Sequence, residues 1–304
     1  AENKKKIAVV GAGPSGMQFA LTASARGHEV TLIEREKVLG GKVVPGSRPK
    51  IKFDFKNYLD YLIREVRLAE EKGGIILQTG VEADTQWLKE QNFDAIVYNI
   101  GTTSVVPRIP GVDQADWVQA TDLLCEPEKL GDARRTVVIG GGVVGCETAY
   151  WLKYEKGCDV TVVEMLPYIM SGACTANRYH LIHYMEKAGV KLLNCAKVTG
   201  FTKNSVQIEK NISKGVPDPY NTWQPQLPEN IANPLAKKIG PETEVQELPA
   251  DLVVFAMGGR PDESLYLEGL RMHAAKELYN IGDSFAGGRV LEAARAAYRL
   301  ARDI

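Results

Sequence analysis

The chain has 304 residues, which is long enough for two domains of ordinary size, each with its own core. Its 37 Lys and Arg residues nearly balance its 38 Asp and Glu residues, so the overall charge does not indicate binding to nucleic acid or to an anionic membrane. The longest apolar runs are far too short to cross a bilayer and no signal peptide precedes the first strand, so the sequence predicts a cytoplasmic protein.

The first predicted strand, residues 7–10, leads directly into a glycine-rich loop and a helical pattern, and a second strand ends at the acidic Glu34. In a dinucleotide-binding loop the first glycine permits a tight bend, the second lets the backbone approach a pyrophosphate, and the third lets the helix pack on the strand. The helix N-terminus then stabilises the phosphates with unpaired N–H groups. The loop consists of Gly11, Ala12, Gly13, Pro14, Ser15 and Gly16.

The sequence continues with a predicted helix over residues 55–72 and predicted strands at 75–77 and 95–98. Prolines flank the segment 106–111, which indicates a crossing between domains.

The same strand–loop–helix pattern occurs a second time. The apolar run at 137–139 precedes a loop from Gly140 to Gly145, and the strand after the next helical pattern ends at Glu164. Residues 27–34 also align without gaps with residues 157–164. Both acids lie near the spacing of roughly 20 residues expected for a ribose-binding carboxylate. A glycine-rich turn in another kind of α/β protein is the alternative, but two copies in matching contexts favour two dinucleotide sites.

Beyond the second loop, a helix is predicted near residues 179–187 and a strand at 190–193. Seven of the chain's 15 prolines lie between Pro217 and Pro249, which predicts a proline-rich insertion near 213–249 without a long helix or a central strand. Strands at 251–256 and 278–283 follow, and a last helix starts after residue 289. The predicted fold class is α/β, with two Rossmann-like three-layer dinucleotide-binding domains, the second inserted in the first.

The five cysteines are scattered, and no pair has the Cys-x-x-Cys or Cys-x-x-x-x-Cys spacing of two neighbouring thiols. We therefore expect neither a redox dithiol nor a zinc or iron–sulfur site, and predict no metal ligand. The cysteines are Cys125, Cys146, Cys158, Cys174 and Cys195.

The two loops and the Gly282-Asp283 pair before the last helix resemble the two-dinucleotide flavoproteins of the glutathione reductase superfamily. The segments 215–220 and 280–283, together with the missing dithiol, resemble more closely the C-terminal module of old-yellow-enzyme-like 2,4-dienoyl-CoA and 2-enoate reductases. The resemblance implies an FAD-binding domain at 1–120 and 258–304, and an NAD(H)-binding domain at 121–257. It also implies a barrel domain with FMN and an iron–sulfur cluster, in the same polypeptide or in a partner.

By resemblance, the first loop would hold the FAD pyrophosphate through Gly11, Gly13, Pro14, Ser15 and Gly16, and Glu34 would bind the adenosine ribose. Val81 would contact adenine through its backbone, Asp283 would bind the ribitol or pyrophosphate, and Arg289 and Val290 would lie near the flavin pyrimidine edge. The other residues implied for the FAD site are Arg35, Gly41, Lys42, Gly101 and Gly282.

In the second site, Glu164 would bind the 2′-hydroxyl of the nicotinamide dinucleotide and repel a 2′-phosphate. No arginine follows at residues 165–167, so NADH is predicted over NADPH. Gly259 would complete the nicotinamide side. Hydride transfer between nicotinamide and flavin needs no side-chain acid or base, so no catalytic residue is predicted. The implied pyrophosphate contacts are Gly140, Gly142, Val143, Val144 and Gly145.

Two segments depart from the family pattern near the expected flavin path. The usual Ala-Thr-Gly is Asn99-Ile100-Gly101 here, and the usual Gly-Gly-Gln is Gly40-Gly41-Lys42. Lys42 either stabilises a reduced, anionic flavin or is simply solvated.

The resemblance implies an FAD-dependent NADH oxidoreductase module that accepts hydride from NADH on FAD and passes electrons to an FMN and iron–sulfur barrel domain or partner, which reduces an enoate or enoyl-CoA. One alternative is a redox-silent module that holds ADP, as in trimethylamine dehydrogenase. Another is a freestanding NADH dehydrogenase or ferredoxin reductase.

Overall fold

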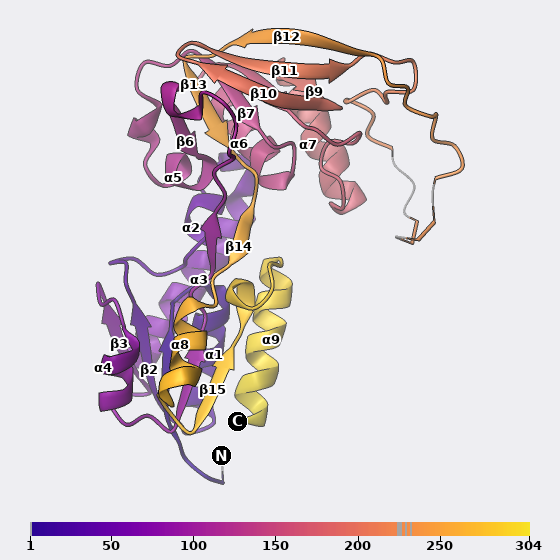
Figure 1. Cartoon of the computed structure of the whole chain (residues 1–304). Coiled ribbons are helices and arrows are strands. Elements are labelled where there is room, and N and C mark those ends of the chain that lie inside the picture. The colour runs from indigo at the N-terminus through magenta and orange to yellow at the C-terminus, as the bar shows by residue number, and fades with distance from the viewer. Residues whose placement is uncertain (1, 224–226, 229, 232) are drawn as a thin grey trace. The chain divides into compact units, whose positions relative to one another are not determined.

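The computed structural model describes residues 2–223, 227–228, 230–231 and 233–304, and the chain divides into two compact units (Figure 1). The first unit consists of Ala1–Ser104 and Gly259–Ile304, and the second of Val105–Gly258. The second unit is thus inserted in the first. The boundary expected after residue 120 lies earlier, because the strand β6 (Trp117–Gln119) pairs with β13 (Leu252–Phe255) of the second unit. The return boundary, expected before residue 258, follows Gly258.

The first unit is built on a five-stranded parallel sheet in the order β15-β4-β1-β2-β3. Its elements in chain order are β1 (Lys6–Val10), α1 (Pro14–Ala25), β2 (Glu29–Glu34), α2 (Val43–Gly46), η1 (Lys50–Lys52), α3 (Phe53–Glu71), β3 (Ile75–Thr79), α4 (Thr85–Glu90), β4 (Ala95–Tyr98), β5 (Thr102–Ser104), β14 (Gly259–Pro261), α8 (Ser264–Met272), β15 (Glu277–Asn280), η4 (Gly282–Ser284) and α9 (Val290–Asp303).

Helices cover both faces of this sheet. Successive strand residues point to opposite faces, so Ile7 and Val9 enter one buried cluster while Ala8 and Val10 enter another. Side chains of α1, α3 and α9 complete the first cluster, and side chains of α4 and α8 complete the second. Because every strand is parallel, all the strand carboxyl ends lie at one edge, where α/β proteins bind their ligands.

The second unit contains a second five-stranded parallel sheet, in the order β6-β13-β7-β8-β9. Besides β6 and β13, its elements are η2 (Val112–Gln114), α5 (Ala120–Cys125), η3 (Pro127–Leu130), β7 (Arg135–Ile139), α6 (Val143–Tyr154), β8 (Asp159–Val163), α7 (Thr175–Ala188), β9 (Lys191–Leu193), β10 (Ala196–Thr202), β11 (Ser205–Asn211) and β12 (Thr243–Pro249).

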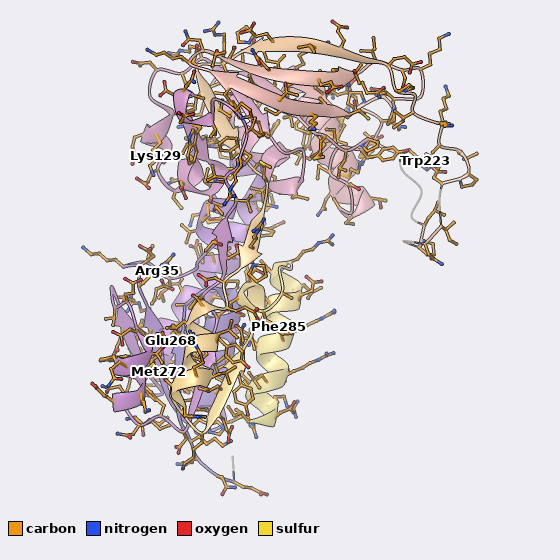
Figure 2. All side chains as sticks on the ribbon, in the orientation of Figure 1. Arg35, Lys129, Trp223, Glu268, Met272 and Phe285 are labelled. Carbon is orange, nitrogen blue, oxygen red and sulfur yellow. The ribbon has the colours of Figure 1, made fainter. Side chains whose placement is uncertain are left out.

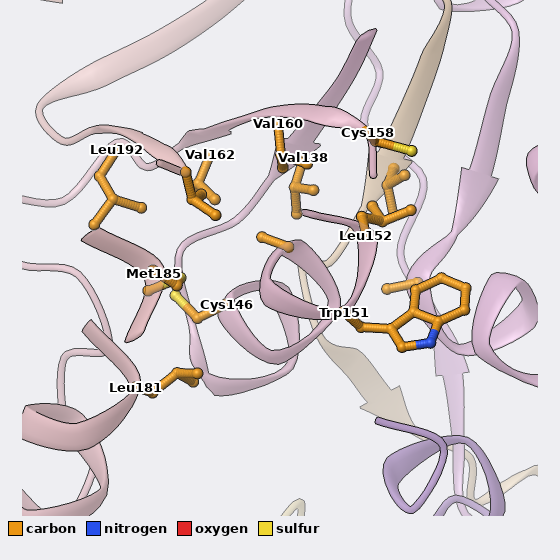
Figure 3. Close-up of a cluster of buried hydrophobic side chains, with 14 of the residues drawn as sticks. Val138, Cys146, Trp151, Leu152, Cys158, Val160, Val162, Leu181, Met185 and Leu192 are labelled. Atoms are coloured by element: carbon orange, nitrogen blue, oxygen red, sulfur yellow. The ribbon is translucent and has the colours of Figure 1, made fainter. Parts of the chain in front are cut away.

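The two faces of the second sheet are covered differently. On one face, Val138 and Val160 pack with Cys146 and other buried side chains of α5, α6 and α7 (Figure 3). The other face packs against the antiparallel sheet β10-β11-β12, where the rings of Phe255 and Phe201 meet edge to face at 5.9 Å. The three predicted layers are present, but one of them is a sheet.

The end of the predicted proline-rich insertion, residues 243–249, is a regular strand at the edge of its sheet, which agrees with the prediction that the insertion contains no central strand. This strand, β12, pairs antiparallel with β11 along its whole length. It lies at the edge of its sheet, and Pro249 is its last residue. Proline is tolerated there because no further strand requires its missing N–H group.

The first residues of the insertion are anchored to the second unit. The hydroxyl of Tyr220 donates to the carbonyl of Val190 at 2.8 Å, and the buried guanidinium of Arg178 donates to the carbonyl of Thr222 at 2.7 Å. Trp223, the next residue, is 61% exposed (Figure 2). The predictions for residues 224–226, 229 and 232 lie outside the described residues.

The two glycine-rich loops have the same backbone geometry. The N–H of Gly11 donates to the carbonyl of Ile33 at 2.8 Å, and the N–H of Gly140 donates to the carbonyl of Val163 at 2.9 Å. Both first glycines have a positive φ, +100° and +108°, which side chains other than glycine rarely adopt. The structure therefore repeats the same turn at the end of β1 and of β7.

The third glycine of each loop leaves no room for a side chain. A Cβ at Gly16 would lie 2.0 Å from the carbonyl oxygen of Gly11, and a Cβ at Gly145 would lie 1.9 Å from that of Gly140. Because backbone atoms would have to move, we expect Gly16→Ala and Gly145→Ala each to cost about 1–3 kcal/mol in unfolding free energy.

The second glycine of the first loop provides the control. A Cβ at Gly13 would meet no atom within 4 Å, and its φ is −69°, so Gly13→Ala should leave stability nearly unchanged. Thermal unfolding without added dinucleotide measures the difference. Equal losses for Gly16→Ala and Gly13→Ala would contradict this packing.

Candidate dinucleotide sites

Glu34, the last residue of β2, closes the first loop. One of its carboxylate oxygens accepts the N–H of Ala12 at 2.7 Å, and the other accepts the N–H of Glu36 at 2.9 Å. The residue is only 8% exposed. Each carboxylate oxygen has a second acceptor position, so Glu34 can hold the loop and still accept a hydrogen bond from a ribose hydroxyl.

Glu164 makes the same two contacts in the second unit. Its carboxylate accepts the N–H of Gly141 at 2.7 Å and the N–H of Leu166 at 2.8 Å. The sequence indicated both acids only as ribose ligands. The hydrogen bonds with which they close the loops occur at equivalent positions in the two units, but the sequence spacing alone does not reveal these bonds.

The space above the second glycine is open in both loops. Gly13 and Gly142 precede α1 and α6, and a Cβ at either position would meet no atom within 4 Å. The first-turn N–H groups of these helices have no partner within the helix. Pro14 lacks an N–H group whereas Val143 has one, so the second loop offers one more donor. Space and donors together fit a dinucleotide pyrophosphate at each loop.

The side chain of Ser15 points into the protein. Its hydroxyl donates to the side-chain oxygen of Asn99, and Ser15 is only 2% exposed. Only its backbone N–H is therefore available to a phosphate. In the second loop the equivalent position is Val144, which is 48% exposed beside Val143 at 39%.

The segment after β2 packs on the first loop. The N–H of Gly40 donates to the carbonyl of Ala12 at 2.9 Å, and a Cβ at Gly41 would lie 3.1 Å from the Cα of Gly13. Lys42 donates from its ammonium to the hydroxyl of Thr102. The side chain of Lys42 is otherwise exposed, but crowding at the ammonium lowers its pKa by desolvation, and Asp283 opposes that shift.

The turn before α9 also lies against the first loop. A Cβ at Gly282 would come within 2.5 Å of the Ser15 hydroxyl oxygen, and Gly282 has a positive φ of +66°. The carboxylate of Asp283 accepts the N–H of Gly288 at 3.1 Å, and the N–H of Arg289 donates to Glu292 at 3.0 Å. Val290 then begins α9. Gly41, Lys42, Gly282 and Asp283 are thus brought together with Gly13 and Ser15.

Val81 and Arg35 lie next to the backbone of Glu34. The N–H of Val81 donates to the carbonyl of Glu34 at 3.0 Å, so only the carbonyl of Val81 remains for an adenine contact. The Arg35 side chain is 68% exposed and pairs with Glu36 at 3.5 Å (Figure 2). Such a pair contributes little to stability and leaves Arg35 accessible.

Gly101 and Gly259 have different surroundings. A Cβ at Gly101 would meet no atom within 4 Å, as expected for a residue facing a ligand. A Cβ at Gly259 would lie 2.4 Å from the hydroxyl oxygen of Thr102, because β14 pairs with β5. Close packing of these two strands already requires a glycine at position 259, independently of any nicotinamide contact.

Among the residues that the structure describes, no two cysteines are joined by a disulfide. Cys146 is buried in the helical core of the second unit (Figure 3), and burial raises the pKa of its thiol well above its usual range. Nor does this part of the chain contain a group of three His, Cys, Asp or Glu side chains arranged to hold a metal. None of the described helices is long and apolar enough to cross a membrane.

Known relatives resemble the whole chain but are much longer. An NADH oxidase from Thermoanaerobacter brockii is 30% identical over 99% of this chain and 41% of its own length. A cinnamate reductase from Clostridium sporogenes is 32% identical over 100% of this chain and 40% of its own length. The chain therefore spans about two fifths of the length of these relatives.

Solved structures also resemble the whole chain and are much longer than it. A 2-naphthoyl-CoA reductase in complex with 2-naphthoyl-CoA superposes with a TM-score of 0.83 at 28% identity, over 100% of this chain and 40% of its own. Histamine dehydrogenase from Rhizobium sp. 4-9 superposes with a TM-score of 0.78 at 18% identity, over 99% of this chain and 42% of its own, and shares the fold.

The resemblance to two-dinucleotide flavoproteins is thereby confirmed. A family described as pyridine nucleotide-disulphide oxidoreductase matches residues 5–279, which is most of the chain. Its members bind FAD and use NAD(P)H. The two open glycine loops, each closed by a glutamate, fit these two dinucleotides. The chain belongs to the pyridine nucleotide-disulphide oxidoreductase family.

Proposed function

We propose that this chain is the NADH-oxidising FAD module of a longer reductase. It accepts hydride from NADH on FAD and passes the electrons to an FMN and iron–sulfur barrel that reduces an enoate or an enoyl-CoA. The observation that carries the proposal is the pair of equivalent loops, each with an open second glycine and a glutamate that retains free acceptor positions. Two such loops in one chain suit a resident flavin and an exchanging nicotinamide.

In this proposal the first loop holds FAD, which supplies the hydride acceptor when it is bound. The backbone N–H groups of Gly13, Ser15 and Gly16 would bind the pyrophosphate, and Glu34 would bind the adenosine ribose. Asp283 would accept hydrogen bonds from the ribitol. The positive charge of Lys42 would stabilise negative charge on the reduced flavin, because Lys42 follows Gly41, which packs on the first loop, and its ammonium donates to Thr102.

The second loop would hold NADH. Gly142, Val143, Val144 and Gly145 line the open space at the start of α6. Glu164 would accept hydrogen bonds from the ribose hydroxyls and would repel a 2′-phosphate. No cation follows at residues 165–167, where Met165 and Leu166 are 67% and 49% exposed. The expected preference is therefore for NADH over NADPH.

The relatives support the proposed acceptor. A cinnamate reductase and a 2-naphthoyl-CoA reductase are named for unsaturated acids or thioesters, and an NADH oxidase is named for the donor. Each is much longer than this chain, which leaves room for a second redox domain. The absence of a Cys-x-x-Cys or Cys-x-x-x-x-Cys pair in the sequence argues against transfer through a dithiol. The cytoplasmic setting stays a prediction.

The absorbance spectrum of the purified chain tests the proposal. After incubation with FAD and removal of the excess, the chain should be yellow and should bleach when NADH is added without oxygen. Enoate reduction by the chain alone should be absent, since the FMN domain is missing. A colourless chain that retains ADP would instead support the redox-silent alternative and contradict the proposed function.

Exchange of Glu164 tests the nicotinamide assignment. Glu164→Gln removes the negative charge and one of the two oxygens that accept loop N–H groups. Because the lost loop contact affects both nucleotides alike, the NADPH-to-NADH ratio of flavin-bleaching rate constants should rise about tenfold, or about 1.4 kcal/mol. Glu34→Gln, at the equivalent position of the first loop and measured with excess FAD, should leave that ratio unchanged. An unchanged ratio in Glu164→Gln, or a wild-type preference for NADPH of about tenfold, would contradict the assignment.

A further inference from the structure

One side chain that reaches the first loop has no counterpart in the second, just as the Cys146 thiol, which donates to the carbonyl of Gly141 at 3.4 Å, has none in the first. Asn99 follows β4 and is 8% exposed. Its side-chain nitrogen donates to the carbonyl of Gly11 at 2.8 Å, and its side-chain oxygen accepts the hydroxyl of Ser15. The equivalent residue after β13 is Ala256, and the equivalent of Ser15 is Val144. Neither side chain can form such hydrogen bonds.

Asn99 adds a second hydrogen bond to the first peptide group of the loop. The peptide between Gly11 and Ala12 is held at both ends, its carbonyl by Asn99 and its N–H by Glu34. The corresponding peptide of the second loop has its N–H held by Glu164. Among the described residues, no side chain donates to the carbonyl of Gly140.

The hydrogen bond to Ser15 extends the effect to the helix. Ser15 belongs to the first turn of α1, whose N–H groups face the open space above Gly13. The turn at Gly282 packs over this pair, since a Cβ there would lie 2.5 Å from the Ser15 hydroxyl oxygen and 2.8 Å from the Asn99 side-chain oxygen. Asn99 therefore links β4, the loop, α1 and the turn before α9.

We propose that Asn99 is a positioning residue that keeps the first loop in its binding conformation, so that FAD stays resident while the second loop releases its nicotinamide after each turnover. The proposal rests on the proposed function, because it takes FAD as the ligand of the first loop. A loop that is already held in the bound conformation loses less conformational entropy when FAD binds. Its apparent affinity for FAD is also higher, because no part of the free protein is in a loop conformation that cannot bind. A cofactor that is exchanged each cycle gains nothing from such retention.

The dissociation rate of FAD tests the proposal. Asn99→Ala gives the first loop the residue that the second loop has at this position. FAD should dissociate about tenfold faster, which corresponds to about 1.4 kcal/mol, because a loop that Asn99 no longer holds leaves its binding conformation more readily while FAD is bound. The affinity of the second loop for NAD⁺ should not change. Asn204→Ala, at an exposed position of the second unit, is the matched control and should change neither quantity.

A double-mutant cycle separates positioning from a general loss of stability. Ser15→Ala removes one hydrogen bond of Asn99 but leaves the Gly11 carbonyl paired, so it should speed FAD release less than Asn99→Ala does. Because both residues act through one network, Ser15→Ala should have almost no additional effect in the Asn99→Ala background. Ser15→Ala also tests the contact if Asn99→Ala does not fold.

The possible failures are distinguishable. If wild-type protein takes up no FAD, the proposed function itself is contradicted. If wild-type protein binds FAD but the two variants release it at the wild-type rate, even with a lowered melting temperature, Asn99 is only structural and this inference is overturned. Additive effects of the two substitutions would also overturn it, since Asn99 would then not act through Ser15.

Discussion

The hydrogen bond between a strand-end glutamate and the second residue of a glycine loop is the contact on which both candidate sites depend. Glu34 accepts the N–H of Ala12, and Glu164 accepts the N–H of Gly141, both at 2.7 Å. Each carboxylate thereby ties the loop after one strand to the end of the next strand. The helix that follows can then direct its unpaired N–H groups into an open space instead of closing over it.

The same carboxylate connects folding to ligand choice. Its two oxygens are each used once by the backbone, and each keeps an acceptor position that a ribose hydroxyl can use. Negative charge at that point also disfavours a 2′-phosphate. In the proposed function, one residue type would thus both hold the turn and select the dinucleotide, and Glu34 and Glu164 have matching contacts although the loops around them differ.

Much of this arrangement could be predicted from the sequence because it depends on local patterns. The glycine spacing, the apolar runs at 7–10 and 137–139 and the strand-end acids identify both parallel sheets, and the resemblance to two-dinucleotide flavoproteins implies the insertion of one unit in the other. The strands β10, β11 and β12 were not predicted, because buried and exposed residues alternate clearly only in the first half of β10, and the prolines near β12 argued against a long helix or a central strand. Pairing with a neighbouring strand, which the sequence does not show, decides their conformation.

Local sequence patterns also could not predict the details of the first site. Asn99 was visible only as a departure from a family pattern, and its contacts with Gly11 and Ser15 depend on residues brought together from separate strands and turns. The inward direction of the Ser15 hydroxyl follows from the same contact. Gly259 was assigned to the nicotinamide side, yet its close packing on Thr102 needs a glycine for a reason that only the pairing of β5 and β14 reveals.

The central claim is that the two loops bind different dinucleotides, and equilibrium binding to two glycine variants measures this most directly. A methyl group at Gly13 or at Gly142 would enter the open space above its own loop without touching the protein. The account predicts that Gly13→Ala loses FAD and keeps NAD⁺, whereas Gly142→Ala loses NAD⁺ and keeps FAD. Loss of both ligands in each variant, or loss of the same ligand in both, would contradict it.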